Sequence, residues 1–299
     1  MCGIVGLFMK KPEHEWKLGS LLAGMLGVLS DRGPDSAGFA VFGAGAPDTI
    51  KLTLRGAKGT DFRAIVSRAA AATGQRLDVT PRDTHAVVAL PAGEEAAVRA
   101  ALAQVAPDIA VVGAGRRMEL YKEVGRPDLV AGRFGLDSMR GSHGIGHTRM
   151  ATESAVTTEG AHPFTTGLDQ CLVHNGLLSN HNAVRRDLMH EGLSFATDND
   201  SEVAAGYLTW RMSRGASLRE ALTSALSDLD GFYTFVVGTE SGFGVLRDPI
   251  ACKPAVMAET DDYVAFGSEY RALVGLPGID AARIWEPEPA TVYFLERPH

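Results

Sequence analysis

The sequence is poor in cysteine and contains no long apolar run and no cluster of basic residues. It has three cysteines in 299 residues, and no two of them form a CxxC pair. Disulfide stapling and zinc or iron–sulfur ligation are therefore not expected. No apolar run approaches the roughly 20 residues that span a bilayer. The net charge of −7 without a Lys/Arg block disfavours nucleic acids and anionic membranes as partners.

Neither end of the sequence resembles a targeting signal. The apolar stretch MCGIVGLF precedes Lys10 and Lys11, which is the reverse of the order in a secretory signal. The final Glu-Arg-Pro-His is not a prenylation or retention motif. With 45% hydrophobic and 22% charged residues, the composition is that of an ordinary folded protein and not of a disordered one. We therefore expect a soluble, cytoplasmic protein.

Apolar periodicity predicts short strands separated by helices. Leucines and Met25, spaced three and four residues apart, predict a helix over Trp16–Leu29. Later helices are predicted at His181–His190, Ser201–Ser213 and Leu218–Leu229. Predicted strands lie at Ile4–Phe8, Ala37–Phe42, Ile50–Leu54, Ile145–Met150, Cys171–His174, Tyr233–Gly238, Gly244–Leu246, Tyr263–Gly267 and Thr291–Leu295. This pattern favours an α+β fold with two stacked sheets flanked by helices.

Residues 60–135 differ from their surroundings. They are rich in Ala and Arg, are bordered by glycines, and predict a helix, a strand, a helix, a strand and a short final helix. They contain no phosphate-binding loop or dinucleotide fingerprint. We therefore expect one domain over residues 1–299 with residues 60–135 as an inserted α+β unit.

Cys2 directly follows the initiator Met1. Because small second residues normally permit removal of Met1, Cys2 is predicted to carry both a thiol and a free α-amine. An amine with a reference pKa of about 7.7–8.0 can act as general base for its own thiol near neutral pH. A chance cysteine is the simpler interpretation of Cys2 alone. The following Gly3-Ile4-Val5-Gly6 instead favours a buried strand that would hold the thiol in place.

Four further segments follow Cys2 in a fixed order, and together with it they resemble the class II (Ntn-type) glutamine amidotransferases. The segments are Arg32-Gly33-Pro34-Asp35-Ser36-Ala37-Gly38, Gly146-His147-Thr148-Arg149-Met150-Ala151-Thr152, Val173-His174-Asn175-Gly176 and Asn199-Asp200-Ser201-Glu202-Val203. Weaker similarities occur at Arg247-Asp248-Pro249, Lys253-Pro254 and Gly267-Ser268-Glu269. The resemblance implies a four-layer αββα sandwich. It also implies that L-glutamine is the substrate.

The resemblance also implies a role for each matching residue. Cys2 would attack the glutamine side-chain amide and form a glutamyl thioester. Asn175 and the backbone N–H of Gly176 would stabilise the oxyanion. Arg149, with Thr148 beside it, would bind the α-carboxylate, for which a planar guanidinium is well suited.

Asp200 would bind the α-ammonium group of glutamine, and Arg32, Gly33 and Asp35 would support the nucleophile. Each segment also has a simpler interpretation. His174-Asn175-Gly176 alone favours an ordinary Asn-Gly turn, and Asp200 alone is typical of a helix cap.

Other residues depart from the pattern or lie outside the implied mechanism. Met150 follows the arginine where many relatives carry an aromatic residue or Leu. Cys171 and Cys252 are predicted to be buried small hydrophobes. His147 and His162 are expected to be structural, with their hydrogen bonds satisfied.

The predicted insertion also resembles part of a larger assembly. Its tail, Met118–Pro127 with the helical Asp128–Leu136, resembles stand-alone glutamate-synthase-like amidotransferase subunits, among them the small subunit of N-methylglutamate synthase. This implies glutamate-synthase-like partner chains. FMN and iron–sulfur clusters would belong to those partners, and no cofactor or metal is expected in this chain.

Three functions remain open at this level. The first is a glutamine-hydrolysing subunit that delivers ammonia, or an activated glutamyl group, to a partner. The second is a catalytically silent assembly or regulatory subunit of the same complex, and the third is a hydrolase of another γ-glutamyl or peptide amide. Arg149 together with Asp200 favours a free α-amino acid as substrate, because each would recognise one of its ends.

Overall fold

A computed structural model describes residues 2–151 and 155–296 of the chain. Its main sheet is antiparallel, with strand order β15-β13-β14-β1-β8-β2-β7. These strands are β15 (Arg283–Trp285), β13 (Val256–Glu259), β14 (Tyr263–Gly267), β1 (Gly3–Met9), β8 (His143–Arg149), β2 (Ser36–Phe42) and β7 (Met118–Val124). The N-terminal strand β1 thus lies in the interior of the sheet, where all seven of its residues are buried.

A second antiparallel sheet packs against the first, with order β16-β12-β11-β10-β9. Its strands are β16 (Val292–Glu296), β12 (Gly242–Arg247), β11 (Gly231–Gly238), β10 (Gln170–Leu178) and β9 (Phe164–Gly167). Ile4 and Phe8 of β1 share one buried cluster with Val173 of β10 and Phe243 of β12. Because side chains alternate along a strand, Val5 and Leu7 face the opposite side of the main sheet.

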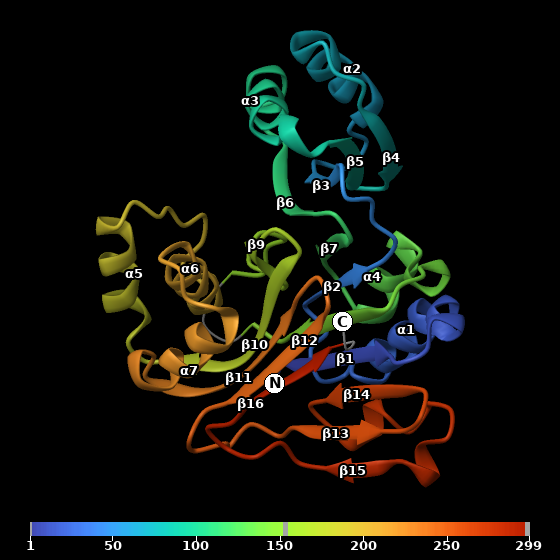
Figure 1. The fold of residues 1–299 in the computed structure, drawn as a ribbon, viewed down its shortest axis with the longest axis vertical. Coiled ribbons are helices and arrows are strands. Elements are labelled where there is room, and N and C mark those ends of the chain that lie inside the picture. The colour runs from blue at the N-terminus through green and yellow to red at the C-terminus, as the bar shows by residue number, and fades with distance from the viewer. Residues whose placement is uncertain (1, 152–154, 297–299) are drawn as a thin grey trace.

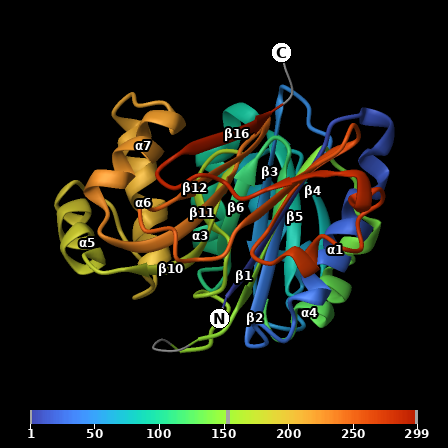
Figure 2. The same ribbon diagram turned by 90° about the horizontal axis from the view of Figure 1, so that it is seen from below.

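Helices cover the outer faces of both sheets. On the main sheet lie η1 (Pro12–Lys17), α1 (Leu18–Val28), α4 (Pro127–Phe134), η3 (Leu136–Ser138), η4 (Tyr270–Ala272) and η5 (Ile279–Ala281). On the second sheet lie α5 (His181–His190), α6 (Asp200–Ser213) and α7 (Leu218–Asp228). Figure 1 shows these two helical groups on opposite sides, and Figure 2 shows the same arrangement from below. The predicted four-layer αββα order is confirmed.

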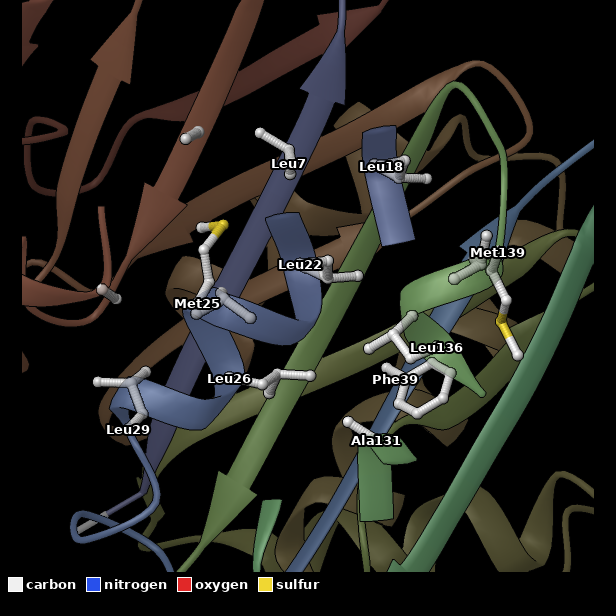
Figure 3. Close-up of a cluster of buried hydrophobic side chains, with 14 of the residues drawn as sticks. Leu7, Leu18, Leu22, Met25, Leu26, Leu29, Phe39, Ala131, Leu136 and Met139 are labelled. Carbon is white, nitrogen blue, oxygen red and sulfur yellow. The ribbon is translucent and has the colours of Figure 1, made fainter. Parts of the chain in front are cut away.

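Packing of α1 buries one face of β1. Leu18, Leu22, Met25 and Leu26 are almost completely buried and belong to the same cluster as Leu7. Figure 3 shows these side chains directed at the strands beneath them. The helix predicted over Trp16–Leu29 therefore exists as α1, but it begins only at Leu18. Pro12 starts a preceding 3-10 turn instead.

A third sheet forms a separate unit with its own core. Its order is β4-β5-β3-β6, and its strands are β4 (Asp78–Arg82), β5 (His85–Pro91), β3 (Thr49–Arg55) and β6 (Ala110–Gly115). The helices of this unit are η2 (Ala92–Glu94), α2 (Phe62–Thr73) and α3 (Glu95–Val105), and together these elements enclose a distinct hydrophobic cluster. Figure 1 shows this unit projecting from the rest of the molecule.

The limits of this unit differ from those expected from the sequence. Its sheet spans residues 49–115, whereas the expected insertion spans 60–135. Strand β3 pairs with β5 and β6 and so belongs to the unit. In contrast, β7 pairs with β2 in the main sheet, and α4 packs in the core of the main sheet. The tail of the expected insertion is therefore part of the main body.

Candidate active site

A cleft of about 440 Å³ lies where the ends of β1, β8, β10 and α6 meet. Its lining includes Cys2, Arg149, Gly176 and Asp200. These four residues come from four separate segments of the sequence. The fold therefore brings together the predicted nucleophile, the predicted cation, one predicted oxyanion donor and the predicted carboxylate.

Strand pairing places Cys2 beside the end of β8. Gly3 pairs with Thr148 in the β1–β8 ladder, so the preceding Cys2 lies next to Arg149, the last residue of β8. The half-buried Cys2 thiol is 3.9 Å from the carbonyl oxygen of Met150. The Cys2 carbonyl accepts a 2.6 Å hydrogen bond from Nε of Arg32. The thiol thus faces the cleft while its backbone is held from behind.

The turn that contains Gly33 and Asp35 supports the arginine segment. Asp35 N–H donates to the Arg149 carbonyl at 3.1 Å, and its carboxylate accepts from Ala151 N–H at 2.8 Å. Gly33 lies so close that a Cβ there would be 2.6 Å from the Arg149 nitrogen. Glycine is therefore required at this position by close backbone approach. Thr152, the last residue of the predicted segment that follows, lies outside the described residues.

Arg149 and Thr148 point to opposite faces of the main sheet. Arg149 is 5% exposed, lines the cleft, and donates from Nη1 to the Ala155 carbonyl at 3.2 Å. The Thr148 hydroxyl is fully buried and donates to the Leu29 carbonyl at 3.5 Å, on the α1 side. This difference follows from the alternation of side chains along β8. The geometry favours a packing role for the Thr148 side chain over the predicted substrate contact.

His174-Asn175-Gly176 lies inside β10 and not in a turn. All three residues pair with β11, and Asn175 is opposite Thr234. Gly176 has φ of 153°, and a Cβ there would be 2.1 Å from the Phe232 carbonyl oxygen. No other residue fits this position.

Asn175 is 3% exposed, and its side-chain Nδ2 has no hydrogen-bond partner among the described residues. A buried amide donor without a partner costs free energy. Asn175 itself is not among the residues that line the cleft, although its neighbours His174 and Gly176 are, so its role as an oxyanion donor stays a prediction.

Asp200 is the first residue of α6, and its neighbour Asn199 is the helix cap. The Asn199 side chain accepts from Ser201 N–H at 2.9 Å. The Asp200 carboxylate instead accepts from Leu178 N–H at 3.0 Å and lies 3.9 Å from Nδ1 of His174. Asp200 therefore ties α6 to the end of β10 and presents a negative charge to the cleft. Capping does not explain this residue.

Three buried histidines lie behind or beside the cleft. The rings of His147 and His162 stack with centroids 4.0 Å apart. Nε2 of His147 contacts the His174 carbonyl at 2.9 Å, whereas neither ring nitrogen of His162 has a partner in the described part of the chain. The expectation of satisfied hydrogen bonds is therefore met only in part for His147 and not for His162.

Burial sets the charge of these histidines. It lowers the pKa of His147 to about 3 and the pKa of His162 well below the ordinary value. It also lowers the pKa of His174, against the opposing attraction of Asp200. All three rings are neutral at pH 7.

Lys253 is a cleft residue to which sequence reasoning assigned no role. It lines the cleft from the loop after β12, and its Nζ lies 4.9 Å from the centroid of the Phe232 ring. The Arg247 guanidinium holds this loop by donating to the carbonyls of Ala251 and Lys253. The weaker similarity at Arg247-Asp248-Pro249 and Lys253-Pro254 was the available signal.

The two remaining cysteines have different environments. Cys171 is fully buried in β10, as predicted, and burial raises the pKa of its thiol. Cys252 is exposed, so the prediction of a buried residue is wrong there. It lies in the loop that follows β12, where apolar neighbours in the sequence do not correspond to a strand.

The described part of the chain contains neither a metal-ligand cluster nor a membrane-spanning helix. No group of three or more His, Cys, Asp or Glu side chains in residues 2–151 and 155–296 is arranged to hold a metal ion. No helix in the same residues is long and apolar enough to cross a membrane.

Known proteins resemble this chain in both sequence and structure. A glutamine amidotransferase domain model matches residues 147–275. The glutamine amidotransferase-like protein GlxB of Rhizobium meliloti (strain 1021) is 63% identical over 296 residues, which cover 99% of this chain and 98% of that protein. A putative glutamine amidotransferase of Methanothermobacter thermautotrophicus is 31% identical, with 99% of this chain and 100% of that protein covered.

Solved structures support the assignment of the fold. The glutamine phosphoribosylpyrophosphate amidotransferase of B. subtilis superimposes with a TM-score of 0.63 at 20% identity, over 99% of this chain and 47% of that one. The fold is therefore that of the Ntn-type amidotransferases. Together with the relatives that match along almost the entire sequence, these findings show that the chain belongs to the glutamine amidotransferase family.

Proposed function

We propose that this chain hydrolyses L-glutamine with Cys2 as an N-terminal nucleophile. One observation carries the proposal: the Cys2 thiol shares a single cleft with a buried arginine and an aspartate, Arg149 and Asp200. A thiol supplies the nucleophile, and the two opposite charges match the two ends of a free α-amino acid.

In the first half of the reaction, the Cys2 α-amine takes the thiol proton. The sulfur then attacks the carbon of the glutamine side-chain amide, and the carbonyl oxygen becomes an oxyanion. Asn175 Nδ2 and Gly176 N–H would donate to that oxygen. The C–N bond then breaks, the proton returns to the leaving nitrogen, and ammonia and a glutamyl thioester result.

In the second half, water attacks the thioester. The same amine accepts a proton from the water, and the same donors stabilise the second oxyanion. The C–S bond breaks, the thiol is restored and glutamate leaves. This mechanism requires removal of Met1, because a peptide bond to Met1 would block the amine.

Ammonia is proposed to pass to a partner chain of glutamate-synthase type, with N-methylglutamate synthase as the specific candidate. The sequence of Met118–Pro127 with Asp128–Leu136 supports this part of the proposal. FMN and iron–sulfur clusters would be bound by the partner chains. A cytoplasmic location also belongs to the proposal.

A catalytically silent assembly or regulatory subunit is the second candidate. It is favoured by the 49–115 unit, which forms a separate sheet and contributes no residue to the described lining of the cleft. The unpartnered Asn175 amide favours catalysis instead, because a silent chain has no use for a buried donor that lacks a partner.

Kinetics of two substitutions test the assignment of the substrate. Arg149→Lys loses one of the two hydrogen bonds that a guanidinium makes to a carboxylate, and Asp200→Asn removes the charge that faces the α-ammonium group. We expect each loss to be worth about 1.5–3 kcal/mol, so KM for glutamine should rise about 10–100-fold. Arg186→Lys and Asp187→Asn, both exposed on α5, are matched controls and should leave KM unchanged. An unchanged KM in both cleft variants would contradict the assignment.

A further inference from the structure

The nucleophile belongs to a segment that ordinarily frays. The first residues of a chain are mobile unless they are tied down. Here Ile4 exchanges two hydrogen bonds with Ser268, since Ile4 N–H donates to the Ser268 hydroxyl at 2.9 Å and Ser268 N–H donates to the Ile4 carbonyl at 2.9 Å. The residues just after β14 therefore hold the start of β1.

Arg32 holds the Cys2 backbone in a similar way. Its side chain is only 6% exposed and donates from Nε to the Cys2 carbonyl at 2.6 Å. The amine nitrogen, the carbonyl carbon and the Cβ that carries the thiol are all bonded to the Cα of Cys2. Fixing the carbonyl therefore restricts the directions that the amine and the thiol can take.

Glu269 in turn holds Arg32. Its Oε1 pairs with Nη1 of Arg32, and its Oε2 pairs with Nε of Arg271. A buried guanidinium requires a counter-charge. Burial alone would raise the pKa of Glu269, but Arg32 and Arg271 hold that pKa below its ordinary value. The carboxylate is therefore ionised at neutral pH.

Strand register places Glu269 at this position. Val5 pairs with Gly267 at the end of β14, so residues 268 and 269 reach the start of β1. Glu269 is 237 residues from Arg32 in the sequence. Residues that are distant in the sequence thus meet at Cys2.

We propose that Glu269 is a positioning residue for the nucleophile, acting through Arg32 to orient the backbone of Cys2 for attack. This inference rests on the proposed function, in which Cys2 is the nucleophile. Glu269 touches neither the thiol nor the proposed positions of the substrate. Its effect should therefore appear in turnover and not in glutamine affinity, because Arg149 and Asp200 remain in place.

Glu269→Gln tests this role, with Glu259→Gln as the matched control. Glu259 also lies in the main-sheet region, where it pairs with Lys10 at 2.7 Å and is remote from the start of β1. In Glu269→Gln, kcat should fall about 10–100-fold, the effect expected of a misplacement near 1 Å, with KM changed by less than about threefold. In Glu259→Gln both constants should be those of the wild type. A kcat of Glu269→Gln within twofold of wild type would overturn the inference.

A double-mutant cycle separates positioning from general structural damage. If Glu269 acts through Arg32, the variant Glu269→Gln/Arg32→Gln should be no slower than Arg32→Gln alone. If the reductions in kcat of the two single variants multiply in the double variant, Glu269 does not act through Arg32. Glu269→Asp is the second variant in case Glu269→Gln folds poorly, and its retained charge should recover part of the turnover. No recovery in a folded Glu269→Asp protein would also count against the relay.

A final readout does not depend on glutamine turnover. Iodoacetamide labelling of Cys2 at one fixed pH, located by peptide mass, reports how the thiol is presented to solvent. Without Glu269 the backbone of Cys2 is held less firmly, so the labelling rate should rise above that of the wild type and of Glu259→Gln. An unchanged labelling rate overturns the inference. Absence of glutaminase activity in the wild type, or full activity in Cys2→Ala, instead overturns the proposed function.

Discussion

At the residue scale, the segment of β10 that borders the cleft holds a polar group that is costly to the fold unless a ligand uses it. Asn175 Nδ2 is buried without a partner in the described part of the chain, and Gly176 is held in a conformation that only glycine tolerates. Local strain and unmet hydrogen bonds of this kind concentrate at functional sites. They distinguish this segment from an ordinary stretch of strand.

Asn175→Ala should therefore separate activity from stability. Loss of an oxyanion donor is expected to lower kcat about 10²–10³-fold, with KM little changed. Thermal stability should fall little, because the removed amide N–H makes no hydrogen bond in the described structure. Steady-state kinetics and a melting curve check both expectations. Asn182→Ala, exposed on α5, is the control, and equal kcat in the two variants would contradict the assigned role.

Much of the cleft could be predicted from the sequence, because its residues lie in short contiguous segments with distinctive residue types. Cys2, Arg149, Gly176 and Asp200 were identified in this way, and all four line the cleft. The place of Glu269 could not be predicted, because it depends on the register between β1 and β14. The exposed Cys252 was misassigned for the related reason that local apolarity does not reveal a loop.

At the element scale, helices were predicted more reliably than short strands. The predicted helices at His181–His190 and Leu218–Leu229 correspond closely to α5 and α7. Strand β4 was not predicted, because DVTPR contains a proline and lies at a sheet edge, where its residues are half-buried or exposed. Edge strands lack the apolar alternation from which strands are recognised.

The inserted unit also contacts the loop beside the cleft. Arg55 of β3 pairs with Glu159, and the Thr84 hydroxyl donates to Glu123 at 2.9 Å. Glu123 in turn accepts a hydrogen bond from Thr158. From the main sheet, Lys122 donates to the carbonyls of Glu159 and Ala161. The hydrogen bonds that Glu123 and Lys122 make to this loop do not involve the unit and would remain without it.

Excision of the unit should therefore spare catalysis. Gly43 N–H donates to the Arg117 carbonyl, so an Asn-Gly hairpin turn can replace residues 44–116. We expect kcat near the wild-type value and KM raised a few-fold, because the loop loses Arg55 and Thr84. Because the unit projects from the body and lines none of the described cleft, we expect it to serve as a docking surface for the partner, so assembly with co-expressed glutamate-synthase-type chains should be lost. Retained assembly, measured by size-exclusion chromatography, would count against a docking role for the unit.

At the scale of the whole molecule, two stacked sheets and two helical layers could be predicted from the order of strands and helices. The limits of the inserted unit could not, because they depend on which sheet β3 and β7 join. That choice depends on pairing partners distant in the sequence, such as Phe42 with Met118 and Leu52 with Val88. Periodicity identifies a strand but not its neighbour.

Buried histidines should make the whole fold sensitive to acid. Burial lowers the pKa of His85 to about 4 and that of His147 to about 3. The histidine pKa in the unfolded chain is near 6.5. Between pH 6.5 and the lower native pKa of each histidine, the unfolded chain therefore binds more protons than the native state. The free energy of unfolding keeps its full value above about pH 6.5. It falls as the pH drops toward 4, by up to roughly 3 kcal/mol for His85.

Urea unfolding at pH 7.5 and pH 5 measures this loss. The wild-type midpoint should be clearly lower at pH 5. His85→Phe should show a smaller difference between the two pH values, whereas His190→Gln, exposed on α5, should behave as the wild type does. The same pH difference in all three proteins would show that His85 does not contribute.

The most direct test of the central claim is an intact-mass spectrum of the purified protein before and after exposure to 6-diazo-5-oxo-L-norleucine, a glutamine analogue. Cys252→Ala is measured in parallel, because Cys252 is the exposed thiol among the three cysteines. The account predicts a mass that lacks Met1 and a single adduct that maps to Cys2 and is prevented by excess glutamine. A retained Met1 without an adduct, or an adduct confined to Cys252, would contradict it.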